Sequence, residues 1–576
     1  MRERLQILFL LFSASLGLII LRLSYWQVIR GDDLASQAKS QYLAQDSFAP
    51  NRGGINSSDG YPLVLNQNVY ALGVYTPGLK DPARQIVDQV LPLINLTIDD
   101  PAVASDPAKL TPALAALKTN TEQSMLDKLG KDGYSVLARN LTGQEKDAIS
   151  GLNLSGLNFD PSTIREYPEA SLSAHLLGFV GRDDLGSAQG FFGLEGYYDR
   201  ELSGREGVEI QEKDAGGNPL LIGDFQSLPT RPGRNLTLHL DRAAQYLVEQ
   251  ELAEALSRYG ASSGEVLVMD PATGAILAMA ALPTYDPRRF HLFDTSLYKN
   301  PAIANTYEPG STFKVLVMAA AFNEKVIDSA DHCDICAEPV TIGKYTIKTW
   351  NNEYRENATP RDIIVHSDNV GMVWTERKLG GDKLLAYLTN FGFGEKTGID
   401  LQEEVASPLR TRWGEIDYAT ASFGQGIAVT SIQMLRAVGA IANGGVLVEP
   451  HVVSRVDDLP IPAKISRQVV SREAADQITS LMVAAVEEGE AKWAAPKHYR
   501  VAGKTGTAQV SVAGHYDAEK TIASFAGFAP VHNPRFVMLV KLSEPTTSQW
   551  GSETAAPLWF RLADQLLLHY NVPPDK

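Results

Sequence analysis

Cysteine is almost absent from this chain of 576 residues, and its two copies, Cys333 and Cys336, lie together in "DHCDIC". A structural zinc site usually has four ligands, and only His332 lies nearby in the sequence. In an oxidising compartment a short local disulfide that ties one loop is favoured, with a redox role left open as an alternative. We therefore expect no metal site.

Positive charge is also scarce. The chain has 52 Lys and Arg against 68 Asp and Glu, which gives a net charge of −16. A general nucleic-acid binder needs surplus cations to neutralise phosphates, so that class of function is not expected. The hydrophobic share of 44% is typical of globular proteins, and the length predicts two or three folded units.

Long apolar runs are absent except for one at the N-terminus. Leu5 to Val28 contains a single charge, Arg22, and about 20 apolar residues are enough to cross a bilayer as a helix. Arg2 and Arg4 precede the run, which favours a cytoplasmic N-terminus. We expect residues 1–31 to be a cytoplasmic tip and membrane anchor, with the rest of the chain outside the cytoplasm. A cleaved signal peptide is the alternative, but no small-x-small site directly follows the apolar core.

Residues 32–235 lack any chemical grouping of His, Cys or paired acids. The segment alternates short strand-like pieces such as "VYALGVYT" with an irregular Pro/Asp-rich stretch, "DDPAVASDPAKLTP", and helical patches such as "TEQSMLDKLG". This pattern predicts a non-catalytic module.

Residues 236–576 have a more regular pattern. "NLTLHL" alternates like a strand, and Asp241 is placed to cap a helix that ends at Gly260. "GEVLVMDPATGAILAMAA" predicts a hairpin, "SFAGFAP" and "RFVMLVKL" predict a second strand pair, and a helix is expected from Ala555 to His569. We expect one α+β domain with an antiparallel sheet flanked by helices.

The stretch "YEPGSTFKV" places Ser311 and Lys314 three residues apart. A serine needs a base to become a nucleophile, and residues three apart share one face of a helix. The apolar run "VLVMAAAF" that follows would bury the helix, and burial lowers the pKa of a lysine so that its amine can accept a proton. The spacing therefore predicts an activated serine.

Alone, this spacing is a weak signal. It also occurs at Ser36 with Lys39 and at Ser296 with Lys299, where exposed polar groups are the ordinary explanation. Neither of these copies precedes an apolar helical run like the one after Lys314.

A second motif, "VHSDNVGM", contains Ser367, Asp368 and Asn369. On a tight turn the hydroxyl of Ser367 and the amide of Asn369 can face one cleft, where one passes a proton and the other holds a peptide carbonyl. Asp and Asn are also common turn residues, so an ordinary loop is the alternative.

A third motif, "AGKTGTAQV", contains Lys504, Thr505, Gly506 and Thr507. In a strand Thr505 and Thr507 point to one side and Lys504 to the other. Two hydroxyls near a cation can bind a carboxylate, and Gly506 would let a substrate backbone approach closely. "EKTGID" repeats the pattern at 396–398, where a turn is expected instead.

The three motifs occur in the order Ser-x-x-Lys, Ser-Asp-Asn, Lys-Thr-Gly, which resembles the signature of penicillin-binding proteins and class A β-lactamases. "GQGIAVTSIQ" and "ASFAGFAP" fit the same transpeptidase pattern from Asn235 onward. The anchor, "NRGGINSSDGYPLV" and "FFGLEGYYDRELSGREG" resemble the class B, monofunctional type. Ser57 and Ser58 stand where that family usually has Asp-Arg, which leaves the local contacts of the N-terminal module open.

The resemblance implies a penicillin-binding, serine transpeptidase fold with a helical subdomain over 236–576, after an elongated pedestal or interaction module over 32–235. The implied activity is crosslinking of peptidoglycan stem peptides with release of D-Ala, without metal or organic cofactor. Ser311 would be the nucleophile and Lys314 the base, with Ser367 and Lys504 in the proton relay.

The resemblance also assigns substrate contacts. Thr505 and Thr507 would bind the terminal carboxylate around Gly506, and Asn369 would hold the donor peptide. The backbone N–H groups of Ser311 and Thr507 would stabilise the oxyanion. β-Lactams would acylate the same serine.

Within class B the chain looks nearer the division-specific FtsI type than the elongation type, which stays as an alternative. A SEDS-family glycan polymerase, other cell-wall synthesis proteins and the membrane are the partners expected by analogy. A β-lactamase, a carboxypeptidase, and a β-lactam sensor or inactive scaffold are the remaining alternatives. Turnover of a penicillin would separate the lactamase from the transpeptidase.

Overall fold

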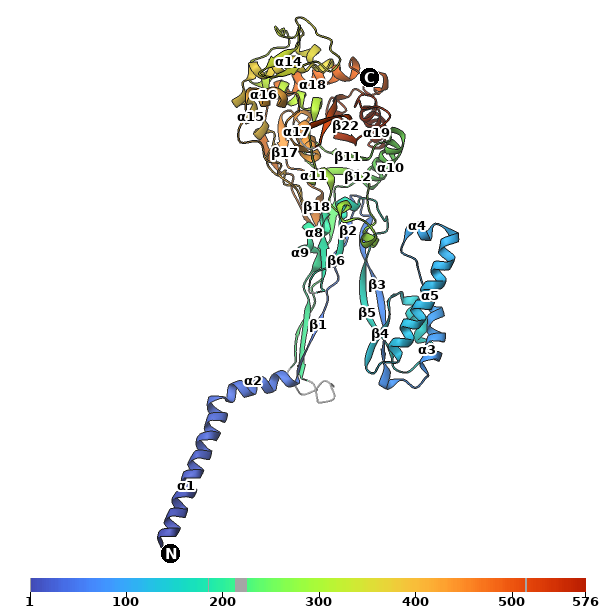
Figure 1. The fold of residues 1–576 in the computed structure, drawn as a ribbon, viewed down its shortest axis with the longest axis vertical. Helices are drawn as coiled ribbons and strands as arrows, with labels where there is room; N and C mark the ends of the chain where they lie inside the picture. Colours follow the sequence, from blue (N-terminus) through green and yellow to red (C-terminus); the bar gives the residue numbers. More distant parts are fainter. Residues whose placement is uncertain (1, 185, 213–224, 513–514) are drawn as a thin grey trace. The chain divides into compact units, whose positions relative to one another are not determined.

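The computed structural model describes residues 2–576 except 185, 213–224 and 513–514 (Figure 1). The described chain forms two compact units. One contains Met1–Gly53 and Ser203–Gly233, and the other contains Gly54–Leu202 and Arg234–Lys576. Each unit is described separately below.

The first unit begins with the predicted apolar helix. Helix α1 (Arg2–Ser24) continues through a π-helical turn at Tyr25–Ile29, and the span Arg2–Ile29 is long and apolar enough to cross a membrane. Its leucine and phenylalanine side chains are exposed, as expected for a helix whose solvent is lipid. Helix α2 (Gly31–Tyr42) follows.

The rest of the first unit is a three-stranded antiparallel sheet in the order β1-β8-β9. Its strands are β1 (Leu43–Phe48), β8 (Gly207–Glu212) and β9 (Phe225–Leu228). Strands far apart in the sequence are thus joined by backbone hydrogen bonds.

The second unit contains a seven-stranded sheet that combines both halves of the chain. Strand β10 (Leu236–Leu238) pairs in parallel with β2 (Ile55–Asn56), so Leu236 lies opposite Ile55. The other strands are β3 (Pro62–Tyr75), β4 (Tyr134–Leu141), β5 (Leu157–Glu166), β18 (Val453–Val456) and β19 (Leu459–Pro460). Strand β3 contains the predicted strand "VYALGVYT" except its last residue, Thr76, which begins a 3₁₀ turn.

The Pro/Asp-rich stretch that we expected to be irregular is largely helical. Helix α5 (Pro107–Leu129) starts inside it, after the short helix α4 (Pro101–Ala104). The carboxylate of Asp106 accepts a hydrogen bond from the N–H of Ala108 at 3.0 Å and so caps α5. Pro107 is tolerated because the first turn of a helix has no use for its N–H.

Ser57 lies in a closed turn in the N-terminal module. Its side chain is buried and hydrogen-bonds to the carboxylate of Asp59, while its N–H donates to the carbonyl of Tyr61 at 2.9 Å. The N–H of Ser58 donates to the carbonyl of Leu240 at 3.0 Å. A serine at this position therefore still forms a hydrogen-bonded turn, with the carboxylate supplied two residues later.

Smaller elements complete the N-terminal part of the second unit. They are α3 (Ala83–Val90), α6 (Gly143–Ser150), α7 (Ala174–Leu177), β6 (Phe179–Arg182), β7 (Ala188–Phe191), α8 (Gly193–Tyr197) and α9 (Asp199–Ser203), which ends at the unit boundary.

A five-stranded antiparallel sheet in the order β12-β11-β23-β22-β21 has the strand with the Lys-Thr-Gly motif, β21, at its edge. Strands β11 (Ser263–Met269) and β12 (Ile276–Leu282) form the predicted hairpin. Strands β22 (His515–Ala529) and β23 (Phe536–Ser543) form the predicted second pair, and β21 (Ala502–Val512) completes the sheet.

Successive side chains of the strands point to opposite faces of this sheet. Apolar side chains therefore lie on both faces, and helices cover each of them. Val266 and Val268 of β11 pack with helices α10 (Arg242–Tyr259) and α19 (Ala555–His569), whereas Leu267 and Met269 pack with α17 (Ser431–Ala442). Figure 1 shows α17 on one side of β11 and β22, with α10 and α19 on the other. The predicted bounds of α10 and α19 are confirmed.

A helical subdomain lies between the hairpin and β21 in the sequence. Its helices are α11 (Pro301–Ala304), α12 (Lys314–Asn323), α13 (Pro360–Val365), α14 (Asn369–Leu379), α15 (Gly381–Asn390), α16 (Glu415–Ala421) and α18 (Arg472–Glu487). The short strands are β13 (Thr306–Tyr307), β14 (Val340–Ile342), β15 (Tyr345–Ile347), β16 (Val429–Thr430), β17 (Val446–Val448) and β20 (Ile465–Gln468). Cys333 and Cys336 form a buried disulfide between α12 and β14, as predicted.

Candidate active site

Ser311 lies in a 3₁₀ turn, Gly310–Phe313, that leads directly into α12. Gly310 has a φ of 58°, and a methyl group there would lie 3.0 Å from the carbonyl oxygen of Thr507. The turn can therefore pack against the backbone of β21 only with glycine at this position. Helix α12 is buried almost throughout, as its apolar sequence predicts.

Lys314 is completely buried at the start of α12. Its Nζ donates to the carbonyl of Ser367 at 2.6 Å, to Ser367 Oγ at 3.2 Å and to Asn369 Oδ1 at 2.8 Å. Burial, followed by the charge of Lys504, holds the pKa of Lys314 well below its usual value. Burial therefore favours the un-ionised amine, the form that can accept a proton.

The expected direct contact of Lys314 with Ser311 is not present as a hydrogen bond among the described residues. Nζ instead binds the Ser-Asp-Asn turn, because the lysine stem points from α12 toward α14. Catalytic hydrogen bonds are often long in a free enzyme and tighten when substrate binds.

The Ser-Asp-Asn motif forms the tight turn between α13 and α14. Ser367 has a φ of 56°, in the left-handed region that non-glycine residues seldom adopt. Asp368 caps α14 by accepting from the N–H groups of Val370 and Gly371 at 2.8 and 3.2 Å. Asp368 thus has a structural role, which leaves Ser367 and Asn369 facing the cleft.

The Lys-Thr-Gly motif lies on β21. Lys504 is buried, and its Nζ donates to Thr505 Oγ1 at 3.2 Å. Burial lowers the pKa of Lys504 to about 8. Thr505 and Thr507 both line the cleft and Lys504 does not, which is the alternation expected of a strand. Thr507 Oγ1 also accepts from the N–H of Gly551 at 3.0 Å.

Gly506 is required for a reason that differs from our expectation. A methyl group there would lie 2.5 Å from Ser524 Oγ, 2.9 Å from Thr312 Cγ2 and 3.0 Å from the carbonyl oxygen of Pro309. The close approach that Gly506 permits is therefore to the turn that carries Ser311. Gly506 is not among the residues that line the cleft in the described chain.

One cleft of about 320 Å³ brings the motif residues together. The described residues that line it are Gly310, Ser311, Trp350, Ser367, Asn369, Phe423, Gln425, Glu490, Thr505, Thr507, Gln509, Thr521, Gln549 and Trp550. Trp350 and Trp550 also contact each other edge to face, with ring centroids 5.1 Å apart. Sequence reasoning missed both indoles and Glu490, since they come from loops with no periodic signal.

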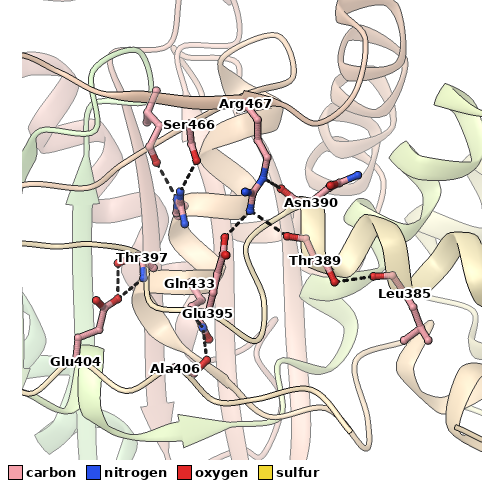
Figure 2. A network of polar contacts seen from close by, with 12 residues as sticks. Leu385, Thr389, Asn390, Glu395, Thr397, Glu404, Ala406, Gln433, Ser466 and Arg467 are labelled. Atoms are coloured by element: carbon pink, nitrogen blue, oxygen red, sulfur yellow. Dashed lines mark hydrogen bonds and ion pairs between the residues drawn. The ribbon is translucent and has the colours of Figure 1, made fainter. Parts of the chain in front are cut away.

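The other copies of the motifs are not among the described residues that line this cleft. Thr397 donates through its hydroxyl to Glu404 Oε1 at 2.6 Å, and Figure 2 shows the two residues paired within a network of polar contacts. Ser296 lies in a 3₁₀ turn, Thr295–Leu297, whose N-terminus Asp294 caps. Ser36 lies on α2, in the first unit. The side chain of Lys39 lies outside the residues whose side chains are described.

Four features together define a serine acyltransferase site of the penicillin-recognising class. They are a serine at the start of a buried helix, a buried lysine one turn along, a Ser-x-Asn turn, and an edge strand lined by threonines. Comparison with known proteins agrees. The family described as "Penicillin binding protein transpeptidase domain" matches residues 264–564, and "Penicillin-binding Protein dimerisation domain" matches residues 47–238.

Individual relatives match along nearly the whole chain. Stage V sporulation protein D of Bacillus subtilis (strain 168) is 32% identical over 98% of this chain and 86% of its own length. Peptidoglycan D,D-transpeptidase FtsI of Escherichia coli (strain K12) is 29% identical over 97% of this chain and 91% of its own. The crystal structure of a peptidoglycan synthetase from Bifidobacterium adolescentis ATCC 15703 is 25% identical, has a TM-score of 0.72, and is matched over 93% of this chain and 98% of its own. The chain belongs to the penicillin-binding protein transpeptidases of class B.

Proposed function

We propose that the protein is a membrane-anchored peptidoglycan D,D-transpeptidase that forms an acyl-enzyme on Ser311. The observation that carries the proposal is one cleft lined by Ser311, Ser367, Asn369, Thr505 and Thr507. Behind it lies buried Lys314, whose pKa is lowered and whose Nζ is hydrogen-bonded to Ser367. Relatives named peptidoglycan D,D-transpeptidases support the same conclusion.

In the acylation step, Lys314 takes the proton from Ser311 Oγ as the oxygen attacks the carbonyl of the penultimate D-Ala. A C–O bond forms, the peptide C–N bond breaks, and a proton passes through Ser367 and Lys504 to the departing D-Ala amine. The hydrogen bond from Lys314 to Ser367 Oγ at 3.2 Å supports this relay.

Substrate positioning follows from the two sides of the cleft. Thr505 and Thr507 bind the terminal carboxylate on the strand side, close to the positive charge of Lys504. Asn369 holds the donor peptide on the helical side. Backbone N–H groups of Ser311 and Thr507 stabilise the oxyanion, and Gly506 acts by letting β21 approach the nucleophile's turn.

In the second step an amine of a neighbouring stem peptide attacks the acyl carbonyl. A new amide bond forms, the bond to Ser311 Oγ breaks, and the proton from the amine returns to the serine. A β-lactam enters at the first step and leaves its opened ring on the same oxygen.

The test is intact-mass measurement after incubation with a penicillin, followed by peptide mapping. We expect one long-lived adduct on the peptide that contains Ser311, and none in Ser311→Ala. Rapid loss of the adduct with penicillin turnover would favour a β-lactamase, and an adduct elsewhere would contradict the assignment of the nucleophile.

We further propose that residues 1–31 place the N-terminus in the cytoplasm and the cleft outside it. Arg2 and Arg4 before the apolar span support this orientation. Alkaline phosphatase joined after residue 31 should be active in cells, while green fluorescent protein at the same place should remain dark. The reverse pattern would contradict the topology.

We propose a septal role with a SEDS-family glycan polymerase as partner, and an elongation role as the alternative. The relative named FtsI supports the septal role. The family match over residues 47–238 supports a separate module over 32–235 before a transpeptidase domain over 236–576, and we propose that module as the docking region. Replacing residues 1–235 by those of an unrelated class B protein should abolish co-purification with the polymerase. Unchanged co-purification would count against this partner surface.

A further inference from the structure

Glu490 lies in the catalytic cleft, yet the acyl-transfer steps above do not use it. It follows α18 in the sequence and lines the same cavity as Ser311 and Ser367, with its side chain exposed. The preceding residue, Gly489, packs closely on α13: a methyl group there would lie 3.1 Å from the carbonyl oxygen of Val365. Glu490 is thereby held next to the end of α13, on the helical side of the cleft.

Glu490 differs in charge from the other residues that line the cleft. Among the described residues that line it, Glu490 is the only one with a formal charge, and the others carry hydroxyls, amides, apolar rings, indoles or no side chain. Lys314 and Lys504 lie behind this lining. The only formal charge on the described lining itself is therefore the negative charge of Glu490, on the helical side of the cleft.

The Glu490 carboxylate is close enough to influence the pKa values of the two buried lysines. Burial lowers the pKa of both Lys314 and Lys504, and the charge of Glu490 opposes that lowering in each case. Burial also lowers the pKa of His366, which Glu490 again opposes. Trp350 donates to the carbonyl of His366 at 3.2 Å, so the indole and the carboxylate border the same part of the cleft.

We propose that Glu490 is a specificity-determining residue that selects the acceptor stem peptide by its charge. It favours acceptors whose amine end is net cationic, such as a lysine side chain or a diamino acid with an amidated carboxyl group. It disfavours acceptors with a free carboxylate beside the attacking amine. This inference rests on the proposed transpeptidase activity.

The physical reason lies in the ionisation of the acceptor. A primary amine with an ordinary pKa of about 10 arrives as an ammonium ion, and a carboxylate at the mouth of the cleft raises its local concentration. The ammonium must lose its proton before it can attack the acyl carbonyl. A free carboxylate on the acceptor would meet like charge at this point, whereas a carboxamide would not.

The experiment uses the full chain in detergent with an N-acyl-D-alanyl thioester as donor. Two acceptors are compared: N-acetyl-lysine amide, and diaminopimelate N-acetylated at one amine with a free carboxylate beside the other. For each variant, the rate of amide formation is divided by the rate of acyl-enzyme formation measured by mass. The readout is the ratio between the two acceptors.

We expect Glu490→Gln to lower the preference for the cationic acceptor about 3- to 10-fold, the effect typical of one partly exposed charge. Glu490→Asp should retain most of the preference, and Glu490→Lys should lower it further. Added salt should weaken it in the unmodified protein and not in Glu490→Gln. Glu488→Gln is the matched control, since Glu488 is exposed, pairs with Arg361 and does not line the cleft.

An unchanged ratio in Glu490→Gln would overturn the proposal. Equal losses with both acceptors would also overturn it, because they would show that the carboxylate acts only through the lysines. If the unmodified protein forms no acyl-enzyme with the thioester, the proposed function itself fails. That result is read before any acceptor is added, so the two failures are distinguishable.

Discussion

Two buried amines stand behind the cleft, and their charge states decide whether acylation can proceed. Lys314 must be un-ionised to take a proton, whereas Lys504 is most useful as a cation beside the substrate carboxylate. Because the amines influence each other, the apparent pKa values of the reaction belong to the pair. Both amines are buried, and burial is the largest cause of each lowered pKa.

The pH dependence of acylation should reveal this arrangement. The rate of penicillin acylation should rise as Lys314 loses its proton and fall again near pH 8 as Lys504 loses its own. Replacing Lys504 by Gln removes the charge that lowers the pKa of Lys314, so the rising limb should move to higher pH. The rate should also fall about 10²- to 10⁴-fold, as for loss of a proton-transfer group.

The measurement is the adduct formation rate from pH 5 to 10, with Lys497→Gln, an exposed lysine away from the cleft, as control. A rising limb that stays in place in Lys504→Gln would contradict the coupling.

A buried ion pair supports the strand that precedes the nucleophile. Lys541 Nζ lies 2.6 Å from Glu265 Oε1, both side chains are 6% exposed, and Ser431 Oγ donates to the same carboxylate. Lys541 Nζ also lies 4.6 Å from the ring centroid of Tyr307, four residues before Ser311. The pair thus lies between the central sheet, α17 and β13.

Breaking this pair should destabilise the protein strongly. Lys541→Met leaves Glu265 buried without its cation, and we expect the free energy of unfolding to fall by about 3–5 kcal/mol. Lys464→Met, which breaks an exposed pair with Glu449, should change it by less than about 1 kcal/mol. Urea unfolding followed by tryptophan fluorescence measures both. Equal losses of unfolding free energy in the two variants would show that the buried pair stabilises the protein no more than an exposed pair does.

At the scale of elements, the site depends on how closely β21 meets the turn that carries Ser311. Gly310 and Gly506 form the two sides of this contact, and each would clash with backbone atoms if it carried a methyl group. The separation between nucleophile and strand is therefore set by backbone packing, before any substrate binds.

Gly506→Ala should slow acylation more than it changes folding. The new methyl group forces β21 away from the Pro309–Thr312 turn, and displacements of this kind cost about 10²-fold in rate. Adding Ser524→Ala should restore little, since Thr312 Cγ2 would still lie 2.9 Å away. Gly143→Ala, which meets nothing within 4 Å, is the control. Stopped-flow acylation beside a thermal melt distinguishes this result from simple unfolding.

Elements with strong local signals were predictable, and those with tertiary causes were not. Helix α10 has a capping Asp241 and a terminal Gly260 with φ of 62°, and both ends agree with prediction. The C-terminal part of helix α5 was predicted by the helical patch "TEQSMLDKLG". Its start was expected to be irregular, although Pro107 occupies the first turn after a capping aspartate. Strand β10 was predicted by the alternation of "NLTLHL", but β2 is only two residues long and no local pattern indicated that the two strands pair.

For the whole molecule, the catalytic cleft and the apolar span belong to different compact units. Every described residue that lines the cleft lies in Arg234–Lys576, in the unit that excludes Met1–Gly53. The chemistry of acylation should therefore be independent of the membrane, while access to a membrane-bound substrate should not.

Removal of residues 1–31 should release the protein from membranes and preserve its reaction with soluble penicillin. The expected result is a protein that stays in the supernatant after ultracentrifugation and still forms the Ser311 adduct. Its melting temperature should stay close to that of the full chain, since the apolar span contributes no buried residues to the core. Loss of the adduct in a folded, truncated protein would contradict the independence of the units.

The amino-acid order alone was sufficient for the apolar anchor, the main helices and strands of the central sheet, and the three motifs, because each depends on local spacing, capping or periodicity. It also separated the meaningful Ser-x-x-Lys from its two other copies through the apolar run that follows. Folding was needed to bring Trp350, Glu490 and Trp550 to one cleft, to give Lys314 its partners, and to show what Gly506 contacts. These features depend on contacts between distant segments, whose distances and burial no local pattern encodes.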